Sequence, residues 1–512
     1  MGNNILSDFD STDPNIEYNC SSTTKCKNFT TLMRLALMTN KNTAILDKIK
    51  LIINQDKSII NKKNNLGWTA LMIACQNSNT DSNLDTVKTL IDAGADANLQ
   101  NNYGWTALMN ASRYSNMDSN LETVKALIDA GADVNLQNNY GWTALMMASR
   151  NSNTDSNLET VTALIGAGAD VNLQNNNGFT ALMIASRYSN TDSNLATVMM
   201  LIDAGTNVDL QEKDGWTALI IASRNSNTDC NLATVKALID AGTNVDLREK
   251  DGRTALMMAS RNSNTDSNLE TVKALIDAGT NLNLQNNNGW TALMVASRYS
   301  NTDSNLATVK ALIDADADVN LQQNNDGQTA LMMASKNSNT DSNLETVKAL
   351  IDANANVDLR EKDGYTALML AAKNSSADGN LETVKLLIDA GSDILLLNNS
   401  GKSAVTINSD ISDKIVKLNL DYQLYNKEIS TAKKLNFKYI LKFIPNHSKS
   451  IKMKPRSIGA KIIKISFKIK TGYLPIDIYN KLLSKNSFIL NYLCITIFDH
   501  FEPAINSYLF SI

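Results

Sequence analysis

Apolar residues recur along most of this chain with the spacing of short amphipathic helices. The segment 121–130 places apolar residues at its first, fourth and eighth positions, with charged residues on the opposite helical face. The segment 106–112 is shorter and has one apolar edge. The stretch 132–139 is too polar and too rich in turn-forming residues for a helix. The pattern therefore predicts a unit of helix, loop, helix and extended turn.

Residue types that begin and end helices mark the second helix of this unit. Ser119 is followed three residues later by Glu122, which is the signature of a capping box at a helix amino end. Gly131 follows the helix, and glycine accepts the left-handed conformation of a helix C-cap at the lowest cost. We therefore expect the second helix to run from Leu121 to Ala130.

The unit repeats with a nearly constant period. A glycine, a variable residue, Thr or Ser, Ala and an apolar residue follow one another ten times, 37 residues apart except for 38 between Gly289 and Gly327. Such a period is typical of a stacked array, in which each unit buries its apolar face against its neighbours. The ten glycines are Gly67, Gly104, Gly141, Gly178, Gly215, Gly252, Gly289, Gly327, Gly364 and Gly401.

These units resemble the ankyrin repeat. The family pattern G-x-T-P-L-H-x-A-A, then L-x-x-V-x-x-L-L and G-A-D-x-N, corresponds to residues 104–112, 121–128 and 131–135, and the match recurs from about residue 67 to 397. The resemblance implies an all-α ankyrin-repeat solenoid. Abundant Asn, Lys and Ile, together with near-identical units, make the chain similar to the ankyrin proteins of giant amoebal DNA viruses such as mimivirus, although intracellular bacteria carry similar arrays.

Three departures from the family pattern are informative. Ala and Met replace the family's proline and histidine in most first helices. The family period is 33 residues, and the four extra residues fall between the helices, in the stretch 151–157. Two units carry Asp316 and Asn354 where the other units end the second helix with glycine, and aspartate suits the left-handed cap less well than asparagine. We expect these two junctions to be the weakest of the stack.

The same pattern divides the chain into five parts. Residues 1–28 are polar and without periodicity, and are predicted to be disordered. Residues 29–64 carry apolar positions of a divergent capping repeat, and residues 65–400 hold nine units. Residues 401–430 form a decayed repeat, and 431–512 are first basic and then apolar.

Composition argues against an enzyme. His447 and His500 are the only histidines and lie outside the array, so a catalytic triad or a multi-histidine zinc site is not expected. The five cysteines are scattered, and no phosphate-binding loop or dinucleotide fingerprint is present. We expect an intracellular, monomeric protein, in a host cytoplasm, without cofactor, metal or membrane span.

Aromatic residues concentrate at the position after the repeat glycine. In ankyrin proteins this position lies near the turn tip on the concave, ligand-facing side, and large aromatics are common anchors of protein interfaces. Arg253, Gln328 and Lys402 interrupt the series, so the strip is expected to be strongest in the amino-terminal half. The alternative is that the rings only pack against the preceding turn. The candidate partner-binding residues are Trp68, Trp105, Trp142, Phe179, Trp216, Trp290 and Tyr365.

A basic series occupies the end of each first helix. A cation there complements the negative end of the helix dipole, and this explanation is favoured over a basic binding strip. The residues are Arg113, Arg150, Arg187, Arg224, Arg261, Arg298, Lys336 and Lys373.

An acidic series is expected in the lengthened loops between the helices. Each loop offers one carboxylate and lacks the ligand spacing of a calcium loop, so local turns are the favoured use. The residues are Asp81, Asp118, Asp155, Asp192, Asp229, Asp266, Asp303 and Asp341.

Two features of the carboxyl-terminal region suggest other functions. Between residues 414 and 470 lysines far outnumber acidic residues, which permits a nucleic-acid or membrane tether, although solvated lysines on a small folded tail are favoured. The segment 473–483 faintly resembles the start of an F-box, which would recruit a ubiquitin-ligase adaptor; an ordinary amphipathic helix explains it equally well. Its F-box-like residues are Leu474, Pro475, Ile478 and Leu482.

Taken together, these features favour a non-enzymatic scaffold that binds another protein, most simply a host protein, along the concave ankyrin face. Fold does not fix the ligand of such a surface, so the sequence leaves the partner's identity open.

Overall fold

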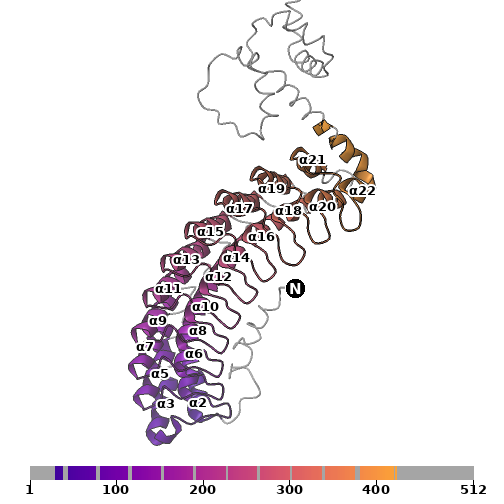
Figure 1. Cartoon of the computed structure of the whole chain (residues 1–512). Helices are drawn as coiled ribbons and strands as arrows, with labels where there is room; N and C mark the ends of the chain where they lie inside the picture. Colours follow the sequence, from indigo (N-terminus) through magenta and orange to yellow (C-terminus); the bar gives the residue numbers. More distant parts are fainter. Residues whose placement is uncertain are drawn as a thin grey trace, which may run out of the picture. The chain divides into compact units, whose positions relative to one another are not determined.

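In a computed structural model, the chain folds into two rows of helices (Figure 1). The structure describes residues 29–38, 44–76, 81–113, 118–150, 155–187, 192–225, 229–261, 266–299, 303–336, 341–374, 381–419 and 421–423. The described residues contain α- and 3-10 helices and turns but no strand, which confirms the predicted all-α class.

Nine units follow one another, each with a short first helix and a longer second helix. The first helices are α4 (Ala70–Gln76), α6 (Ala107–Arg113), α8 (Ala144–Arg150), α10 (Ala181–Arg187), α12 (Ala218–Arg224), α14 (Ala255–Arg261), α16 (Ala292–Arg298), α18 (Ala330–Lys336) and α20 (Ala367–Asn374). The second helices are α5 (Asp81–Asp92), α7 (Asp118–Asp129), α9 (Asp155–Gly166), α11 (Asp192–Asp203), α13 (Asp229–Asp240), α15 (Asp266–Asp277), α17 (Asp303–Asp314), α19 (Asp341–Asp352) and α21 (Leu381–Asp389). Each first helix packs on the first helices of the adjacent units, and the second helices do the same.

Atypical elements lie before and after these units. The helices α2 (Thr31–Met38) and α3 (Ala44–Gln55), with the 3-10 turn η2 (Lys57–Ile59), precede α4. After α21 come the single turn α22 (Ala404–Ile407) and the 3-10 turn η3 (Ser409–Ile411). The chain divides into two units, Met1–Ser412 and Asp413–Ile512, and the described part of the second consists of residues 413–419 and 421–423.

The first helices form the interior of the stack. A threonine precedes each one, and Oγ1 of Thr106 accepts a hydrogen bond from the backbone N–H of Met109 at 3.2 Å. This threonine therefore acts as the N-cap, and the helix starts one residue later than the sequence suggested. Every residue of α6 is buried, because neighbouring first helices cover it on both sides.

The second helices begin earlier than predicted. Helix α7 starts at Asp118 rather than Leu121, so Ser119 lies within the first turn and is not the N-cap of the predicted capping box. The aspartates expected in the loops are, in eight units, the first residues of the second helices. Aspartate is favoured at a helix amino end because its charge complements the helix dipole. The prediction of a loop location for the acidic series was therefore wrong.

The repeat glycines lie where two turns meet. Gly104 has a φ of +79°, which favours glycine on backbone grounds alone. A Cβ there would also lie 2.7 Å from the backbone nitrogen of Asn139 in the next unit. The fixed glycine thus reflects both the turn conformation and the close approach of the neighbouring turn.

The single 38-residue spacing has a local cause. In most units the N–H of the repeat glycine donates to the residue three positions earlier, as Gly104 does to Asn101 at 2.9 Å. Gly327 instead donates to the carbonyl oxygen of Gln323, four positions earlier, at 3.0 Å. The extra residue therefore enlarges one turn and leaves the helices on either side in register.

Both non-glycine caps adopt the predicted left-handed conformation. Asp316 and Asn354 each have a φ of +67°, and they are the non-glycine residues with positive φ among those the structure describes. The chain thus accepts the backbone cost at these two junctions to keep the cap geometry.

Candidate partner-binding surface

The turn before each first helix is closed by one polar side chain, which is buried in most units and half-buried at Asn286. Oδ1 of Asn101 accepts hydrogen bonds from the backbone N–H groups of Tyr103 and Trp105, both at 2.9 Å. Asparagine fills this position in most units because its short amide reaches its own turn. Equivalent bonds are made by Asn64, Asn138, Asn175, Asn286 and Asn398.

Three units use glutamate for the same purpose. Oε1 of Glu212 accepts from the N–H groups of Asp214 at 2.8 Å and Trp216 at 3.0 Å. Glu249 and Glu361 each accept from the corresponding N–H four residues later. Burial raises the pKa of Glu212 and of Glu361. The backbone hydrogen bonds that each carboxylate accepts offset only part of this increase.

Hydrogen bonds join each turn to the next. The backbone N–H of Asn102 donates to the carbonyl oxygen of Leu66 at 3.0 Å, and its Nδ2 donates to that of Asn65 at 3.0 Å. Nε2 of Gln100 donates within its own turn to Gly104 and across to Gln137, at 2.8 and 2.9 Å. These bonds recur along the array, so the turns form a connected edge rather than separate loops.

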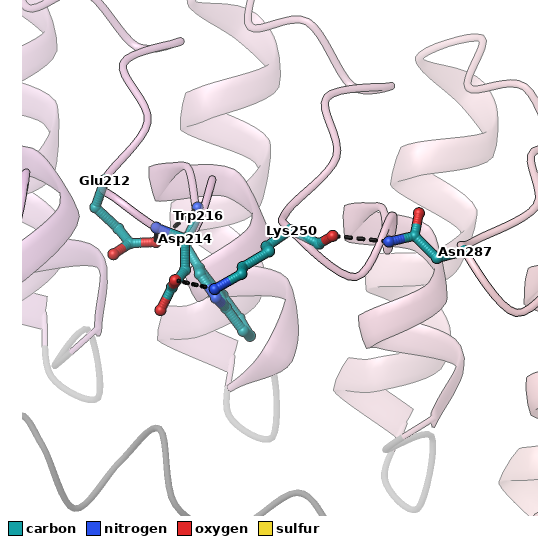
Figure 2. A network of polar contacts seen from close by, with 5 residues as sticks. All are labelled: Glu212, Asp214, Trp216, Lys250 and Asn287. Carbon is teal, nitrogen blue, oxygen red and sulfur yellow. Dashed lines mark hydrogen bonds and ion pairs between the residues drawn. The ribbon is translucent and has the colours of Figure 1, made fainter.

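In the middle of the array this edge is charged. Nζ of Lys250 lies 3.5 Å from Oδ1 of Asp214 in the preceding unit (Figure 2). The carbonyl oxygen of Lys250 accepts from Nδ2 of Asn287 in the following unit at 2.8 Å. One residue therefore links three successive turns.

The rings after the repeat glycines lie between the turns and the first helices. Trp68 and Trp105 are each 1% exposed, Trp142 is 5% exposed and Trp216 is 7% exposed. The half-buried members of the series are Phe179, Trp290 and Tyr365. Ring surface is therefore more accessible in the later units, whereas the sequence suggested an aromatic strip that is strongest at the amino-terminal end.

The structure brings the aromatic and basic series together. The guanidinium carbon of Arg113 lies 5.5 Å from the ring centroid of Trp105, and that of Arg224 lies 5.3 Å from Trp216. Such distances allow cation–π attraction. These side chains also end the first helices, as the dipole explanation requires, so one cation can serve both interactions.

Sequence reasoning treated these two series separately and missed the contact. The available signal was a constant offset of eight residues, which recurs between Trp290 and Arg298 and between Tyr365 and Lys373. A seven-residue helix is about 10 Å long, a distance that two long side chains can bridge together. The ring-to-cation distances are 5.0 Å for Trp290 and 4.8 Å for Tyr365.

Several predicted features lie outside the described residues. These are the F-box-like residues Leu474, Pro475, Ile478 and Leu482, the basic tail after residue 423, and the amino-terminal segment 1–28. The ubiquitin-ligase adaptor and the nucleic-acid or membrane tether therefore remain predictions from sequence.

Across the ranges that the structure describes, no three His, Cys, Asp or Glu side chains cluster in a way that could hold a metal ion. No helix in those ranges has the length and apolar character needed to cross a bilayer.

Comparison with known proteins identifies the family. The chain matches the family described as ankyrin repeats (3 copies) at residues 12–96, 79–156, 152–231, 229–322 and 302–398. These matches cover most of the chain, which therefore belongs to the ankyrin repeat family and is confirmed as a repeat solenoid. Ankyrin repeats are in general non-enzymatic protein–protein interaction modules.

Similar proteins include three ankyrin repeat proteins of Acanthamoeba polyphaga mimivirus, which confirms the predicted resemblance to giant-virus proteins. They are 45%, 43% and 36% identical over 78, 76 and 74 residues, which is 15%, 14% and 14% of this chain. The aligned parts span 13%, 14% and 12% of the relatives' own lengths.

Among solved structures, an ankyrin repeat domain from Acinetobacter baumannii AYE is 30% identical. The alignment covers 42% of this chain and 98% of that domain, with a TM-score of 0.35.

Proposed function

We propose that this protein is a non-enzymatic scaffold that binds another protein, in a host cytoplasm, along the surface formed by its turns and first helices. The observation that carries this proposal is the connected edge of the turns. Asn102 bonds to the preceding unit through both its backbone and its side chain, and Gln100 bonds to the following one. A surface that is already ordered loses little conformational freedom on binding.

The accessible rings supply candidate anchors on this surface. Trp290 and Tyr365 are half-buried, and each lies next to a cationic side chain. Aromatic side chains held in place by their neighbours contribute much of the binding free energy of protein interfaces. Trp105 is only 1% exposed, so its ring offers almost no surface that a partner could contact directly.

The proposal is tested by retention of a protein from amoebal cell lysate on the immobilised full-length chain, followed by titration with the purified protein. The double variant Trp290→Ala, Tyr365→Ala should weaken binding by about tenfold or more, because it removes two anchors. The control is Met199→Ala, which truncates a side chain that is 50% exposed on α11, in the other row of helices.

Thermal unfolding of each variant separates loss of an anchor from loss of the fold. The proposal is wrong if no protein is retained specifically. It is also wrong in its choice of surface if the control weakens binding as much as the double variant does.

A further inference from the structure

The row of first helices exposes very little besides cations in its later units. In α14, α16 and α18, the first six residues of each helix are buried, and the exposed seventh residue is Arg261, Arg298 or Lys336. Helix α20 continues the pattern with Lys373, which is followed by an exposed asparagine at the helix end. The outer surface of this row therefore carries one cation per unit.

The spacing of these cations is set by helix packing. Each of α14, α16 and α18 packs on the next first helix, and packed helices lie about 8–10 Å apart. An extended polyproline II segment rises about 3.1 Å per residue with three residues per turn. Every third side chain of such a segment therefore points the same way, about 9 Å apart, which matches one unit of the array.

Aromatic rings lie against three of these cations, Arg261, Arg298 and Lys373. Tyr299 lies 5.9 Å from the guanidinium of Arg261 and 5.8 Å from that of Arg298, while Trp290 lies 5.0 Å from Arg298. A ring against the cationic group restricts the side chain before a ligand arrives, so less entropy is lost on binding. The guanidinium fork can still donate two parallel hydrogen bonds to a carboxylate.

The cations also repel one another. Burial lowers the pKa of Arg224, and the charges of Arg261 and Arg187 in the adjacent units lower it further. Like charges at this spacing favour a ligand with a matching row of negative charges.

We propose that Arg261, Arg298, Lys336 and Lys373 bind an extended acidic segment of a partner protein, with one carboxylate per unit. This inference rests on the proposed scaffold function and specifies the chemistry of its ligand.

A peptide fits this strip better than a nucleic acid does. The row of first helices is one cation wide, and the turns carry exposed carboxylates at Asp251, Asp326 and Asp363, of which Asp251 pairs with Arg253 at 2.8 Å. A duplex, which carries two lines of phosphates, would place negative charge against these aspartates. A single peptide chain can follow the cations and avoid them.

The test uses the full-length protein and a labelled synthetic peptide of about fifteen residues in which every third residue is Glu and proline favours the extended form. A second peptide has the same composition with its glutamates in one block. Fluorescence anisotropy should show tighter binding of the spaced peptide. A single-stranded oligonucleotide of equal charge should bind more weakly than the spaced peptide.

Protein variants test whether the peptide binds at these four cations. The quadruple variant Arg261→Gln, Arg298→Gln, Lys336→Gln, Lys373→Gln should lose about tenfold or more of the affinity, because four exposed charge pairs each contribute a modest amount. The matched control removes four exposed lysines of the second helices in neighbouring units. Its substitutions are Lys236→Gln, Lys273→Gln, Lys310→Gln and Lys348→Gln.

Circular dichroism and the unfolding midpoint confirm that both variants fold. The proposal is overturned if the spaced peptide does not bind, if the blocked peptide or the oligonucleotide binds as well, or if the two quadruple variants lose affinity equally. If the retained cellular protein still binds the first-helix variant at full affinity, the scaffold function stands and the acidic-segment proposal fails.

Discussion

The backbone N–H of Asn139 donates to the carbonyl oxygen of Tyr103 at 3.0 Å, and this bond draws two successive turns together at Gly104. A Cβ on Gly104 would meet the nitrogen and Oδ1 of Asn139 at 2.7 Å and Cα of Asn138 at 2.8 Å. The glycine that ends the same unit, Gly131, has a similar φ of +78°, yet a Cβ there would meet no atom within 4 Å. Both glycines have the left-handed backbone conformation, but only at Gly104 would a Cβ also clash with the neighbouring turn. Comparing them therefore distinguishes the cost of the backbone conformation from the cost of the clash.

Replacing these glycines should therefore have unequal effects. Gly131→Ala should cost about 1–2 kcal/mol, the usual penalty for a left-handed L-residue. Gly104→Ala should cost clearly more, because the Cβ also pushes the Asn139 turn away and breaks its bond to Tyr103. Urea unfolding of both variants measures the difference. Equal losses would show that the adjacent turn moves without cost.

Much of the fold follows from the 37-residue repeat, and the errors in the sequence-based prediction are confined to single positions. The repeat predicted two helices per unit, a left-handed glycine at the end of the second helix and left-handed caps at Asp316 and Asn354, all of which the structure shows. The start of α7 was misplaced because Asp118 and Ser119 are both common residue types at helix starts. The local sequence does not show which of these two residues begins the helix, because tertiary packing sets where the helix begins.

The glutamates that close the charged turns should make stability depend on pH. Burial raises the pKa of Glu212 and Glu361 above the ordinary value of 4.5, so the folded chain binds more protons than the unfolded chain just above that pH. Their contribution to stability should fall as pH rises from about 4.5 through the raised pKa. Glu212→Gln with Glu361→Gln keeps the Oε1 acceptors and removes the titration.

The double variant should therefore gain stability over the wild-type chain at pH 7, and little or none at pH 4. The measurement is the urea midpoint of both proteins at each pH. The control is Glu270→Gln, which removes an exposed carboxylate that pairs with Lys273 at 2.7 Å and should give no gain at pH 7. A difference between variant and wild type that stays constant with pH would contradict the argument.

The two non-glycine caps should be improvable. Asp316 and Asn354 both have a φ of +67°, and glycine removes the Cβ penalty of that conformation. We expect Asp316→Gly to stabilise the array by about 1 kcal/mol and Asn354→Gly by only a few tenths, because asparagine tolerates this region better. Thermal unfolding checks both values. A larger gain at residue 354 than at 316 would refute the ranking.

The candidate surface was less predictable than the fold, for a physical reason. Spacing along the chain identified the series of Trp216 and of Arg224 but gave no distance between them. The exposure of Trp105 depends on the side chains that cover its ring in three dimensions, so one residue type is buried in one unit and half-buried, as at Trp290, in another. Near-identical units thus differ in what they offer a partner.

Side-chain pairs across the junctions differ from unit to unit. Oγ1 of Thr243 donates to Oδ1 of Asp209 in the preceding unit at 2.7 Å. Where the preceding unit carries asparagine, as at Asn98, the amide instead donates to the carbonyl oxygen of Gly131, and Ala132 stands at the threonine position. An aspartate cannot make that donation, and a threonine supplies the missing donor.

A double-mutant cycle should expose this matching. Thr243→Ala should cost about 1 kcal/mol because it removes the donor of this bond. Asp209→Asn should cost less, because its Oδ1 can still accept and because the chain already has the Asn–Thr combination at Asn172 and Thr206, where Oγ1 of Thr206 donates to the carbonyl oxygen of Leu201 at 2.6 Å. The double variant should cost about 1 kcal/mol less than their sum, because it recreates the Asn–Ala combination found at Asn98 and Ala132. Urea unfolding of the four proteins gives the coupling. Strict additivity would mean that either unit type can follow the other, and that only the shared backbone ladder fixes the order of the stack.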